Sequence, residues 1–382
     1  MRRRWFVLGG AALAAGAGGW WALGRGKAPE VGFTLTDAQL QAARRLMAAH
    51  PVIDAHAHPG RTFLRDGENF ADWKIRLYAL FTAGFEDDAV ADMTAGGVDA
   101  AVWNGVADVQ ILKLGDGGLT PGRDFAPGEA WASYERQIAN LAALEKEGLV
   151  QICRAPEDVL AAKAAGRRGA ILGMEGADFL ENDLSRLDRV HADGVRMLTL
   201  VHYHDNPIAP TMTGAMRKGR LTDFGRAVVA RCNALGIMID ASHAAEPAVA
   251  DMVAASRSPV VLTHTHIRTP TLGHPRFVDP SLARKVAEQG GYIGAWPAGI
   301  GQSSLRDFVD RIVWLIDEIG AAHVAIGSDM DANYKPVLET YRKFPLVVGA
   351  LLARGLDEAV VTGVMGGNFL RVWRETVAAA GG

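Results

Sequence analysis

Short apolar runs alternate with longer amphipathic stretches along most of the chain after residue 36. Eight of these runs have the length and the nearly continuous apolar character of parallel strands that are covered on both faces. They span residues 52–58, 99–107, 169–177, 194–203, 236–243, 259–266, 291–298 and 323–331. Residues 150–155 form a further short run, so an extra strand is expected there as well.

The stretches between the runs have the periodicity of helices. Helices are expected at residues 38–50, where Thr36 and Asp37 provide a cap, and at 223–236, 243–256, 282–290 and 305–320. Strands that alternate with helices predict an α/β fold, and eight such units favour a (β/α)8 TIM barrel over an open doubly wound sheet. No GxGxxG motif follows the first strand, which argues against dinucleotide binding.

Composition allows a large buried core and excludes one class of partner. Of the 382 residues, 49% are apolar, and the formal charge is −3. Lysines and arginines are scattered, so the chain lacks the basic footprint of a nucleic-acid-binding protein. The two cysteines, Cys153 and Cys232, lie in apolar contexts and are expected to be buried free thiols, although an exported protein could pair them.

Residues 1–30 differ from the rest of the chain. A basic start is followed by an apolar run rich in glycine and alanine, and RRWFV at residues 3–7 resembles a twin-arginine export signal. Residues 15–17 offer a small-residue cleavage site, an uncut segment would act as a membrane anchor, and a disordered tail is the alternative. We therefore expect residues 31–382 to form a single barrel domain, exported to the periplasm or anchored facing it.

Polar side chains gather where six of the eight predicted strands end. Of the 11 histidines, seven lie at these ends: His56, His58, His202, His204, His243, His264 and His266. Glu175 and Asp329 end two of the strands. Because residues two apart in a strand point the same way, Asp54, His56 and His58 are expected to face one interior. In a barrel all these ends open on the face where active sites are built.

A cluster of imidazoles and carboxylates is costly to bury unless it is compensated. Neutral histidine nitrogens and carboxylate oxygens are good zinc ligands, and a bound metal supplies hydrolytic chemistry because it lowers the pKa of water. A single histidine at a strand end is more often a satisfied polar core residue. A His-x-His pair, a glutamate, two further histidines and a terminal aspartate, in barrel order, predict a metal centre.

At these positions the chain resembles the membrane (renal) dipeptidases, a family of zinc metallopeptidases with an amidohydrolase-like barrel. The resemblance covers nearly the whole chain after residue 36. It is carried by DAHAH at 54–58, GMEG at 173–176, LVH at 200–202, DASH at 240–243, TH at 263–264, HPR at 274–276, GSDMD at 327–331 and GGNFLRV at 366–372. Each motif alone is weak, and their shared order makes the resemblance specific.

The resemblance implies a centre of two zinc ions. His56 and His58 bind the first ion, His243 and His264 bind the second, and Glu175 bridges both. A zinc-bound hydroxide is then the nucleophile that attacks the peptide bond of a dipeptide. The family has an aspartate at the position of His58, so the more positive cluster leaves the number of ions, one or two, open. Other divalent ions also suit such ligands.

Further residues have roles that the resemblance implies. Asp329 passes a proton to the leaving amine, His202 holds or polarises the scissile carbonyl, and Arg276 pairs with the carboxylate of the substrate. Asp54 is expected to orient the ring of His56 by accepting a hydrogen bond from it.

Three further side chains have no role in the family pattern. His204 and His266 either face the substrate or are plain polar lining, and Trp296 either lines the pocket or packs in the core. The predicted function is that of an exported zinc-dependent dipeptidase. An amidohydrolase acting on N-acyl amino acids, or on another small amide or lactone, is the alternative, and a binding protein without turnover is a third. The family also allows a homodimer.

Overall fold

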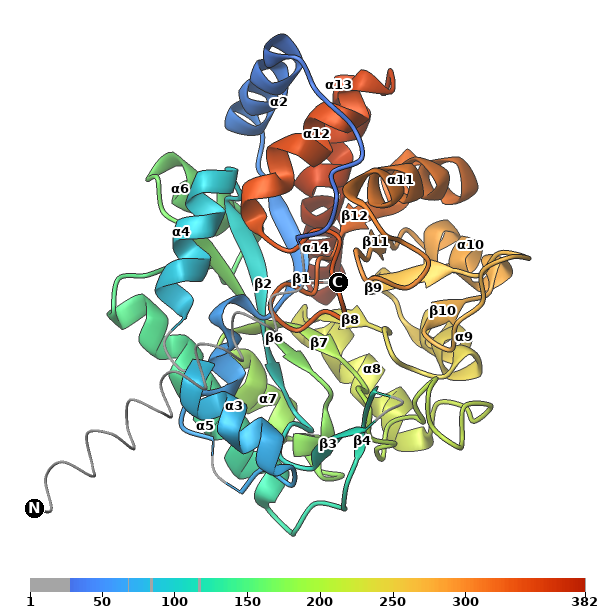
Figure 1. Cartoon of the computed structure of the whole chain (residues 1–382). Helices are drawn as coiled ribbons and strands as arrows, with labels where there is room; N and C mark the ends of the chain where they lie inside the picture. Colours follow the sequence, from blue (N-terminus) through green and yellow to red (C-terminus); the bar gives the residue numbers. More distant parts are fainter. Residues whose placement is uncertain (1–27, 68, 83–84, 116–117, 382) are drawn as a thin grey trace, which may run out of the picture.

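The computed structural model describes residues 28–67, 69–82, 85–115 and 118–381. Ten strands form one sheet, and eight of them follow one another around a barrel of parallel neighbours (Figure 1). In spatial order these strands are β1 (Ile53–Ala57), β2 (Ala100–Val106), β6 (Gly169–Glu175), β7 (Val195–Thr199), β8 (Met238–Asp240), β9 (Val260–Ile267), β11 (Ile293–Ala295) and β12 (Val324–Ile326). The spatial order follows the chain, which confirms the predicted (β/α)8 barrel.

Short strands decorate the barrel. β5 (Gln151–Ile152) pairs with β6 and confirms the extra strand predicted at residues 150–155. β10 (Phe277–Val278) pairs with β9. β3 (Leu112–Gly115) and β4 (Gly118–Pro121) form an antiparallel hairpin. The sequence analysis missed β3, β4 and β10, because these strands are too short or too polar to stand out as apolar runs.

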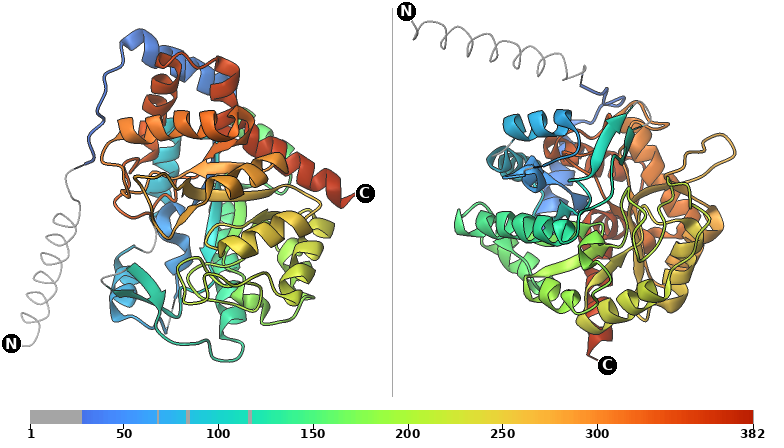
Figure 2. Two further views of the ribbon diagram at one scale, coloured as in Figure 1. Left: turned by 90° about the vertical axis from the view of Figure 1, so that its right-hand side faces the viewer. Right: turned by 90° about the horizontal axis from the view of Figure 1, so that it is seen from below.

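Helices surround the barrel on its outside (Figure 2). They are α2 (Asp37–Ala49), α3 (Trp73–Thr82), α4 (Glu86–Gly96), α5 (Glu129–Lys146), α6 (Pro156–Ala164), α7 (Arg186–Ala192), α8 (Asp223–Leu235), α9 (Glu246–Ala255), α10 (Pro280–Glu288), α11 (Leu305–Ile319), α12 (Phe344–Ala353), α13 (Glu358–Thr362) and α14 (Asn368–Ala380). The five predicted helices are confirmed as α2 and α8 to α11. Thr36 caps α2, and its hydroxyl accepts a hydrogen bond from the backbone of Gln39.

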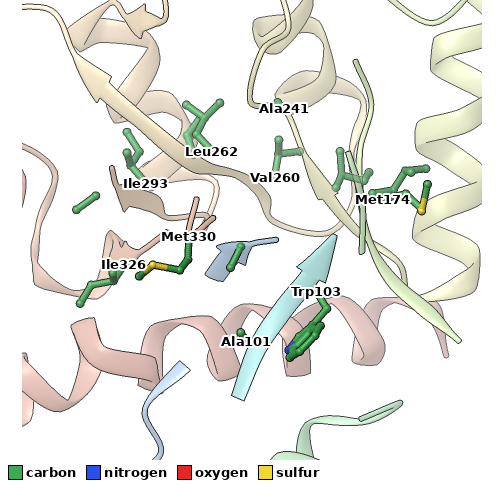
Figure 3. Packing of buried hydrophobic residues seen from close by; sticks show 14 of the residues in the cluster. Ala101, Trp103, Met174, Ala241, Val260, Leu262, Ile293, Ile326 and Met330 are labelled. Atoms are coloured by element: carbon green, nitrogen blue, oxygen red, sulfur yellow. The ribbon is translucent and has the colours of Figure 1, made fainter. Parts of the chain in front are cut away.

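Two apolar layers hold the barrel together. The smaller layer contains side chains from most barrel strands, such as Ala100 and Met238, packed with Trp373 of α14. It fills the barrel interior beneath the strand ends. The larger layer lies between the strands and the surrounding helices, and Figure 3 shows part of it with Trp103 and Met174 on the neighbouring strands β2 and β6. On β2 the side chains alternate between these layers, because Val102 belongs to the smaller one and Ala101 and Trp103 to the larger.

Strand β1 departs from this alternation. Ile53 and Ala55 belong to the interior layer, but Ala57 belongs to the outer one. The register against β2 shifts between Asp54 and Ala57, as it does at a β-bulge. His56 therefore points inward, whereas Asp54 points to the outer side. The prediction that both face one interior is wrong for Asp54, because two-residue alternation does not hold across the irregularity.

The barrel closes where β1 meets the segment after β12. The backbone N–H of Asp329 donates to the carbonyl of His56 at 2.8 Å, and the N–H of His58 donates to the carbonyl of Met330 at 2.9 Å. These two bonds continue the ladder of backbone hydrogen bonds past the end of β12. They join β1 to the loop that follows β12 and so close the barrel.

The carboxylate of Asp54 reinforces this closure. It is fully buried and accepts hydrogen bonds from the backbone N–H of Ser328 at 2.9 Å, from the Ser328 hydroxyl, and from the Tyr341 hydroxyl at 3.0 Å. The N–H of His56 also donates to it, at 3.3 Å. Burial raises the pKa of Asp54 to about 6, although these hydrogen bonds act in the opposite direction.

Several strands end earlier than the predicted runs. β7 ends at Thr199, β8 at Asp240 and β12 at Ile326, whereas the runs extend to residues 203, 243 and 331. The residues beyond these ends leave the sheet as loops. Their polar side chains turn toward the mouth of the barrel, and a regular strand would send every second one outward.

Both cysteines are buried and unpaired, as predicted. Cys153 and Cys232 have no exposed surface, and burial raises the pKa of each thiol to about 12. Thiols in such surroundings stay protonated at neutral pH.

The predicted signal-type segment spans residues 1–30, and its first 27 residues lie outside the part of the chain that the structure describes. Among the described residues, no helix combines the length and the hydropathy that crossing a bilayer requires.

Replacing Asp54 by alanine is expected to loosen the barrel closure. The change leaves buried donors on Ser328, Tyr341 and His56 without an acceptor, which should lower the free energy of unfolding by on the order of 3 kcal/mol. Tyr341→Phe is the matched control, because it removes one donor and should cost about 1 kcal/mol. Chemical denaturation followed by circular dichroism measures both. A loss in D54A no larger than in Y341F would contradict the role of Asp54.

Candidate metal centre

The carboxylate of Glu175, the last residue of β6, is surrounded by imidazoles. Each of its oxygens lies within 3.4 Å of at least two Nε2 atoms. From Oε1 the distances are 3.4 Å to His56, 3.1 Å to His243 and 3.3 Å to His264, and from Oε2 they are 3.2 Å to His58 and 3.4 Å to His202. All six side chains are buried. The five residues predicted as metal ligands therefore meet at one point, together with His202.

Two of the site residues have a left-handed backbone conformation, which sets the direction of their side chains. His243, in the loop after β8, has a φ of 67°, and Asp329, in the loop after β12, has a φ of 53°. Such values are strained for residues with a side chain and often occur at functional sites. His264 lies within β9, where the register against β11 is irregular, and its Nε2 reaches Glu175 from the strand itself. The site thus combines one rigid strand with two strained loops.

Asp329 lies at the edge of the cluster. Its Oδ1 is 3.5 Å from Nε2 of His58, and its Oδ2 accepts a hydrogen bond from Nε1 of Trp296 at 3.3 Å. Burial raises the pKa of Asp329, and the negative charge of Glu175 adds to this effect. A carboxyl with a raised pKa, close to the ligands, is suited to proton transfer. Trp296 lines the site, which decides between its two predicted roles.

Carbonyl and carboxylate acceptors fix the rings of two histidines. Nδ1 of His58 lies 3.2 Å from the carbonyl of Asn104 and must donate to it, so Nε2 is left bare in the neutral ring. Nδ1 of His202 donates to the carboxylate of Asp108 at 2.6 Å. Burial lowers the pKa of His202, but Asp108 and Glu175 outweigh it and raise this pKa to about 9.

Asp54 does not contact the ring of His56. The only hydrogen bond between the two residues comes from the backbone N–H of His56, as described above. Nδ1 of the ring lies instead 3.1 Å from the hydroxyl of Thr263, with Asp240 4.0 Å away. The ring is therefore oriented from the β9 side, and the predicted role of Asp54 in orienting this ring is corrected.

Electrostatics suits the cluster to a cation. Burial would raise the pKa of Glu175, but the nearby His202 and His56 hold it well below its usual range. Burial also lowers the pKa of His243 and His264 well below that of a free imidazole. For His56, burial lowers the pKa, but Glu175, Asp329 and Asp240 together outweigh it and raise the pKa. The centre therefore contains an ionised carboxylate next to the neutral rings of His243 and His264, whose lone pairs are available.

The side chains fit a metal better than they fit one another. Nε2 of His56 and Nε2 of His58 are buried and have no hydrogen-bond partner among the described residues. Bare nitrogens facing a carboxylate repel it unless a proton or a cation lies between them. Three groups of side chains could each hold an ion: His56, Glu175 and His264; His56, His58 and Asp329; and Glu175, His202 and His243. Nitrogen and oxygen donors of this kind are typical of zinc.

Arg276 is a buried cation beside this cluster. Its side chain is 3% exposed, and its guanidinium lies 5.2 Å from the ring centre of Trp296. It donates to the carbonyl of His264 at 3.4 Å and contacts the sulfur of Met212 at 3.4 Å, while Nε has no partner. Among the described residues, no carboxylate lies within ion-pairing distance of it. Burial lowers its pKa, and an anion is needed to compensate the charge.

The remaining two strand-end histidines lie farther from Glu175. Nδ1 of His204 pairs with Asp178 at 2.7 Å, and Nε2 of His266 contacts Gln302 at 2.8 Å. Both have polar partners of their own, in keeping with polar lining. Sequence reasoning missed Asp108, which holds His202. The strand-end rule could have found it, because Asp108 follows the run at residues 99–107.

Comparison with known proteins agrees with this geometry. A family model described as "Membrane dipeptidase (Peptidase family M19)" matches residues 40–381. Dipeptidase tcpJ of Claviceps purpurea is 28% identical over 368 residues, which cover 90% of this chain and 86% of that protein. Dipeptidase 3 of Rattus norvegicus is 30% identical over 82% of this chain and 64% of that protein.

Solved structures share the fold. The probable dipeptidase PvdM from Pseudomonas aeruginosa has a TM-score of 0.72 at 20% identity, over 91% of this chain and all of that chain. A metallo peptidase from Rhodobacter sphaeroides, liganded with a phosphinate mimic of the dipeptide L-Ala-D-Ala, has a TM-score of 0.69 at 23% identity, over 86% of this chain and 99% of that chain.

Zinc is expected to stabilise the folded protein through Glu175. A ligand that binds only the folded state, at about 100 times its Kd, adds about 2.7 kcal/mol, so zinc should raise the Tm of chelator-treated protein. Glu175→Gln should lose most of this rise, because it removes the shared carboxylate. His191→Gln, a histidine away from the centre, should keep it. Scanning calorimetry measures the shifts, and an equal rise in E175Q and wild type would contradict the site.

Proposed function

The chain belongs to the membrane dipeptidase family, peptidase family M19, and on this premise we propose that it is a metal-dependent dipeptidase. The observation that carries the proposal is the pairing of two features in one buried site. Five imidazoles face the carboxylate of Glu175, and the unpaired cation of Arg276 lies beside them. The first feature suits hydrolytic metal chemistry and the second suits a substrate with a free carboxylate.

We assign the metal as zinc and the ligands as His56, His58, Glu175, His243 and His264. The carboxylate of Glu175 lies within 3.4 Å of rings from both proposed ligand pairs, His56 and His243, which supports a bridging role between two ions. His58 takes the place of a carboxylate found in the family, so the ion bound by His56 and His58 is held more weakly. When bound, such ions lower the pKa of a water molecule and polarise a carbonyl group.

The chain's own residues handle the proton and the carbonyl. Asp329, with its raised pKa, takes a proton from the attacking water and returns it to the nitrogen of the leaving amine. His202 is protonated at neutral pH, because Asp108 holds its Nδ1–H. Its Nε2–H therefore donates to the oxygen of the scissile carbonyl as negative charge develops there. Trp296 keeps Asp329 in place by donating to Oδ2.

Arg276 binds the C-terminal carboxylate of the dipeptide. Its guanidinium is held by the indole of Trp296 and the carbonyl of His264, which leaves Nε without a partner. A planar guanidinium pairs with a carboxylate through two parallel hydrogen bonds. The buried charge thus selects substrates that end one residue after the scissile bond, and this restricts the enzyme to dipeptides.

Arg276→Ala is expected to raise KM for dipeptides by about 10–1000-fold, from the loss of roughly 1.5–4 kcal/mol of charge-assisted binding. The same dipeptides with an amidated C-terminus should be poor substrates of the wild type and little affected by the change. Steady-state kinetics on both series is the measurement.

Arg268→Ala is the matched control. Arg268 pairs with Glu246 outside the site, so its loss should leave both substrate series unchanged. Unchanged dipeptide kinetics in R276A would contradict this assignment. It would point to the alternative activity on another small amide or lactone, which the same assay would then detect.

Export is proposed from residues 1–30 alone. The paired arginines and the apolar run that follows support a twin-arginine export signal, which is either cleaved or kept as a membrane anchor. A single catalytic domain at residues 31–382 follows it. We expect a homodimer on the family resemblance.

Changing both Arg3 and Arg4 to lysine should retain the protein in the cytoplasm, because the receptor reads the arginine pair. Cell fractionation with zymography measures the distribution. A truncated protein that lacks residues 1–30 should also stay inside. Export of the double variant at the wild-type level would contradict the proposed address.

A further inference from the structure

One hydroxyl group contacts two of the proposed ligand rings. Oγ1 of Thr263 lies 3.1 Å from Nδ1 of His56 and 3.0 Å from Nδ1 of His264. These rings come from β1 and β9, 207 residues apart for the first contact. Thr263 and both rings are fully or almost fully buried, so no solvent competes for these contacts.

Asp240 decides which way the proton of this hydroxyl points. Its Oδ1 accepts from the backbone N–H groups of Ser242 at 2.9 Å and of Thr263 at 3.0 Å. Its Oδ2 accepts from the hydroxyls of Thr199 at 2.6 Å and of Thr263 at 2.7 Å. A side chain that receives four donors acts as an acceptor only, so the single proton of Thr263 Oγ1 is committed to Asp240.

The two remaining lone pairs of Thr263 Oγ1 must then accept. A hydroxyl offers one donor and two acceptor positions, and its two nearest remaining neighbours are the imidazole Nδ1 atoms at 3.0 and 3.1 Å, with the hydroxyl of Ser242 farther away at 3.4 Å. Each of these nitrogens must carry a hydrogen, because two lone pairs at about 3 Å would repel each other. In a neutral ring a hydrogen on Nδ1 leaves Nε2 bare. In both His56 and His264 that bare Nε2 points at Oε1 of Glu175.

Close packing holds Thr263 in this position. A Cβ atom on Gly294 would lie 1.7 Å from the carbonyl oxygen of Thr263, and one on Gly327 would lie 1.8 Å from it. Only glycine at both positions lets the neighbouring backbones approach so closely. The backbone of Thr263 is therefore fixed between the segments of β11 and β12, and the hydrogen bond to Asp240 directs its hydroxyl.

We propose that Thr263, oriented by Asp240, is a positioning residue that holds His56 and His264 in the metal-binding tautomer at the same time. One hydroxyl thus links the ligands of the two ions. The inference rests on the proposed metal centre, and it goes beyond that centre because neither residue touches an ion or the substrate. Acceptors that hold the far nitrogen of a ligand histidine typically change metal affinity by about 10–100-fold.

The test compares zinc affinity in four proteins by competition with a chelating dye. Thr263→Val keeps the shape but removes both acceptor lone pairs, and should weaken zinc binding by about 10–100-fold. Thr263→Ser keeps the hydroxyl and should stay within about threefold of the wild type. Thr211→Val is the matched control. Thr211 is also fully buried, but its hydroxyl has no partner among the described residues, so the zinc affinity of this variant should be unchanged.

Asp240→Asn provides a second variant in case T263V does not fold. The amide keeps an oxygen for the two backbone donors and places its NH2 toward Thr263. The proton of Thr263 must then turn to one ring, and that ring shifts its hydrogen to Nε2, where zinc cannot bind. D240N should weaken zinc binding although the threonine is intact.

Imidazole ¹⁵N spectra of the metal-free proteins, at a pH where the rings are neutral, separate this inference from the proposed function. Hydrogen on Nδ1 of both His56 and His264 in the wild type, and a shift of these two signals toward the other tautomer in T263V and D240N, support the inference. This holds even if the wild type binds no zinc, an outcome that would refute the metal centre alone. Wild-type tautomers and wild-type affinity in T263V, or equal losses in T263V and T263S, would overturn it.

Discussion

A single buried carboxylate surrounded by imidazoles is the constraint on which the rest of the structure depends. Glu175 loses the solvation of its charge inside the barrel, and the rings around it compensate for that loss when a proton or a cation lies between them and the carboxylate. Those rings come from four different strand ends, so the compensation exists only when the barrel is closed in the correct register. The chemistry of the site and the closure of the sheet are therefore parts of one requirement.

The closure itself is built from polar contacts. The first and last strands meet through two backbone hydrogen bonds that flank His56 and His58, and through a carboxylate, Asp54, on the outer side. The irregularity in β1 separates the side chains of the metal centre from the carboxylate that closes the barrel. The two histidines point inward and Asp54 points to the outer side. Strained loops at His243 and Asp329 then complete the cluster. Stability stored in the rigid strands offsets the cost of these strained positions.

The sequence predicted most of this arrangement. Polar residues at the ends of apolar runs, in barrel order, predicted the architecture and the side chains that gather around Glu175, because parallel strands bring their carboxyl ends together. It could not predict the bulge in β1, since an extra residue leaves no mark in an apolar run. It also missed the hydroxyl of Thr263, because a contact between residues far apart in the chain depends on the register of the sheet. Asp108 was visible at a strand end and was overlooked.

The two cysteines have a consequence for where this molecule can mature. Each thiol is buried in an apolar layer of the protein and stays protonated. Neither thiol therefore reacts readily with oxidants or with disulfide reagents. No covalent cross-link has to form during folding. The same native state is therefore reached under reducing and under oxidising conditions.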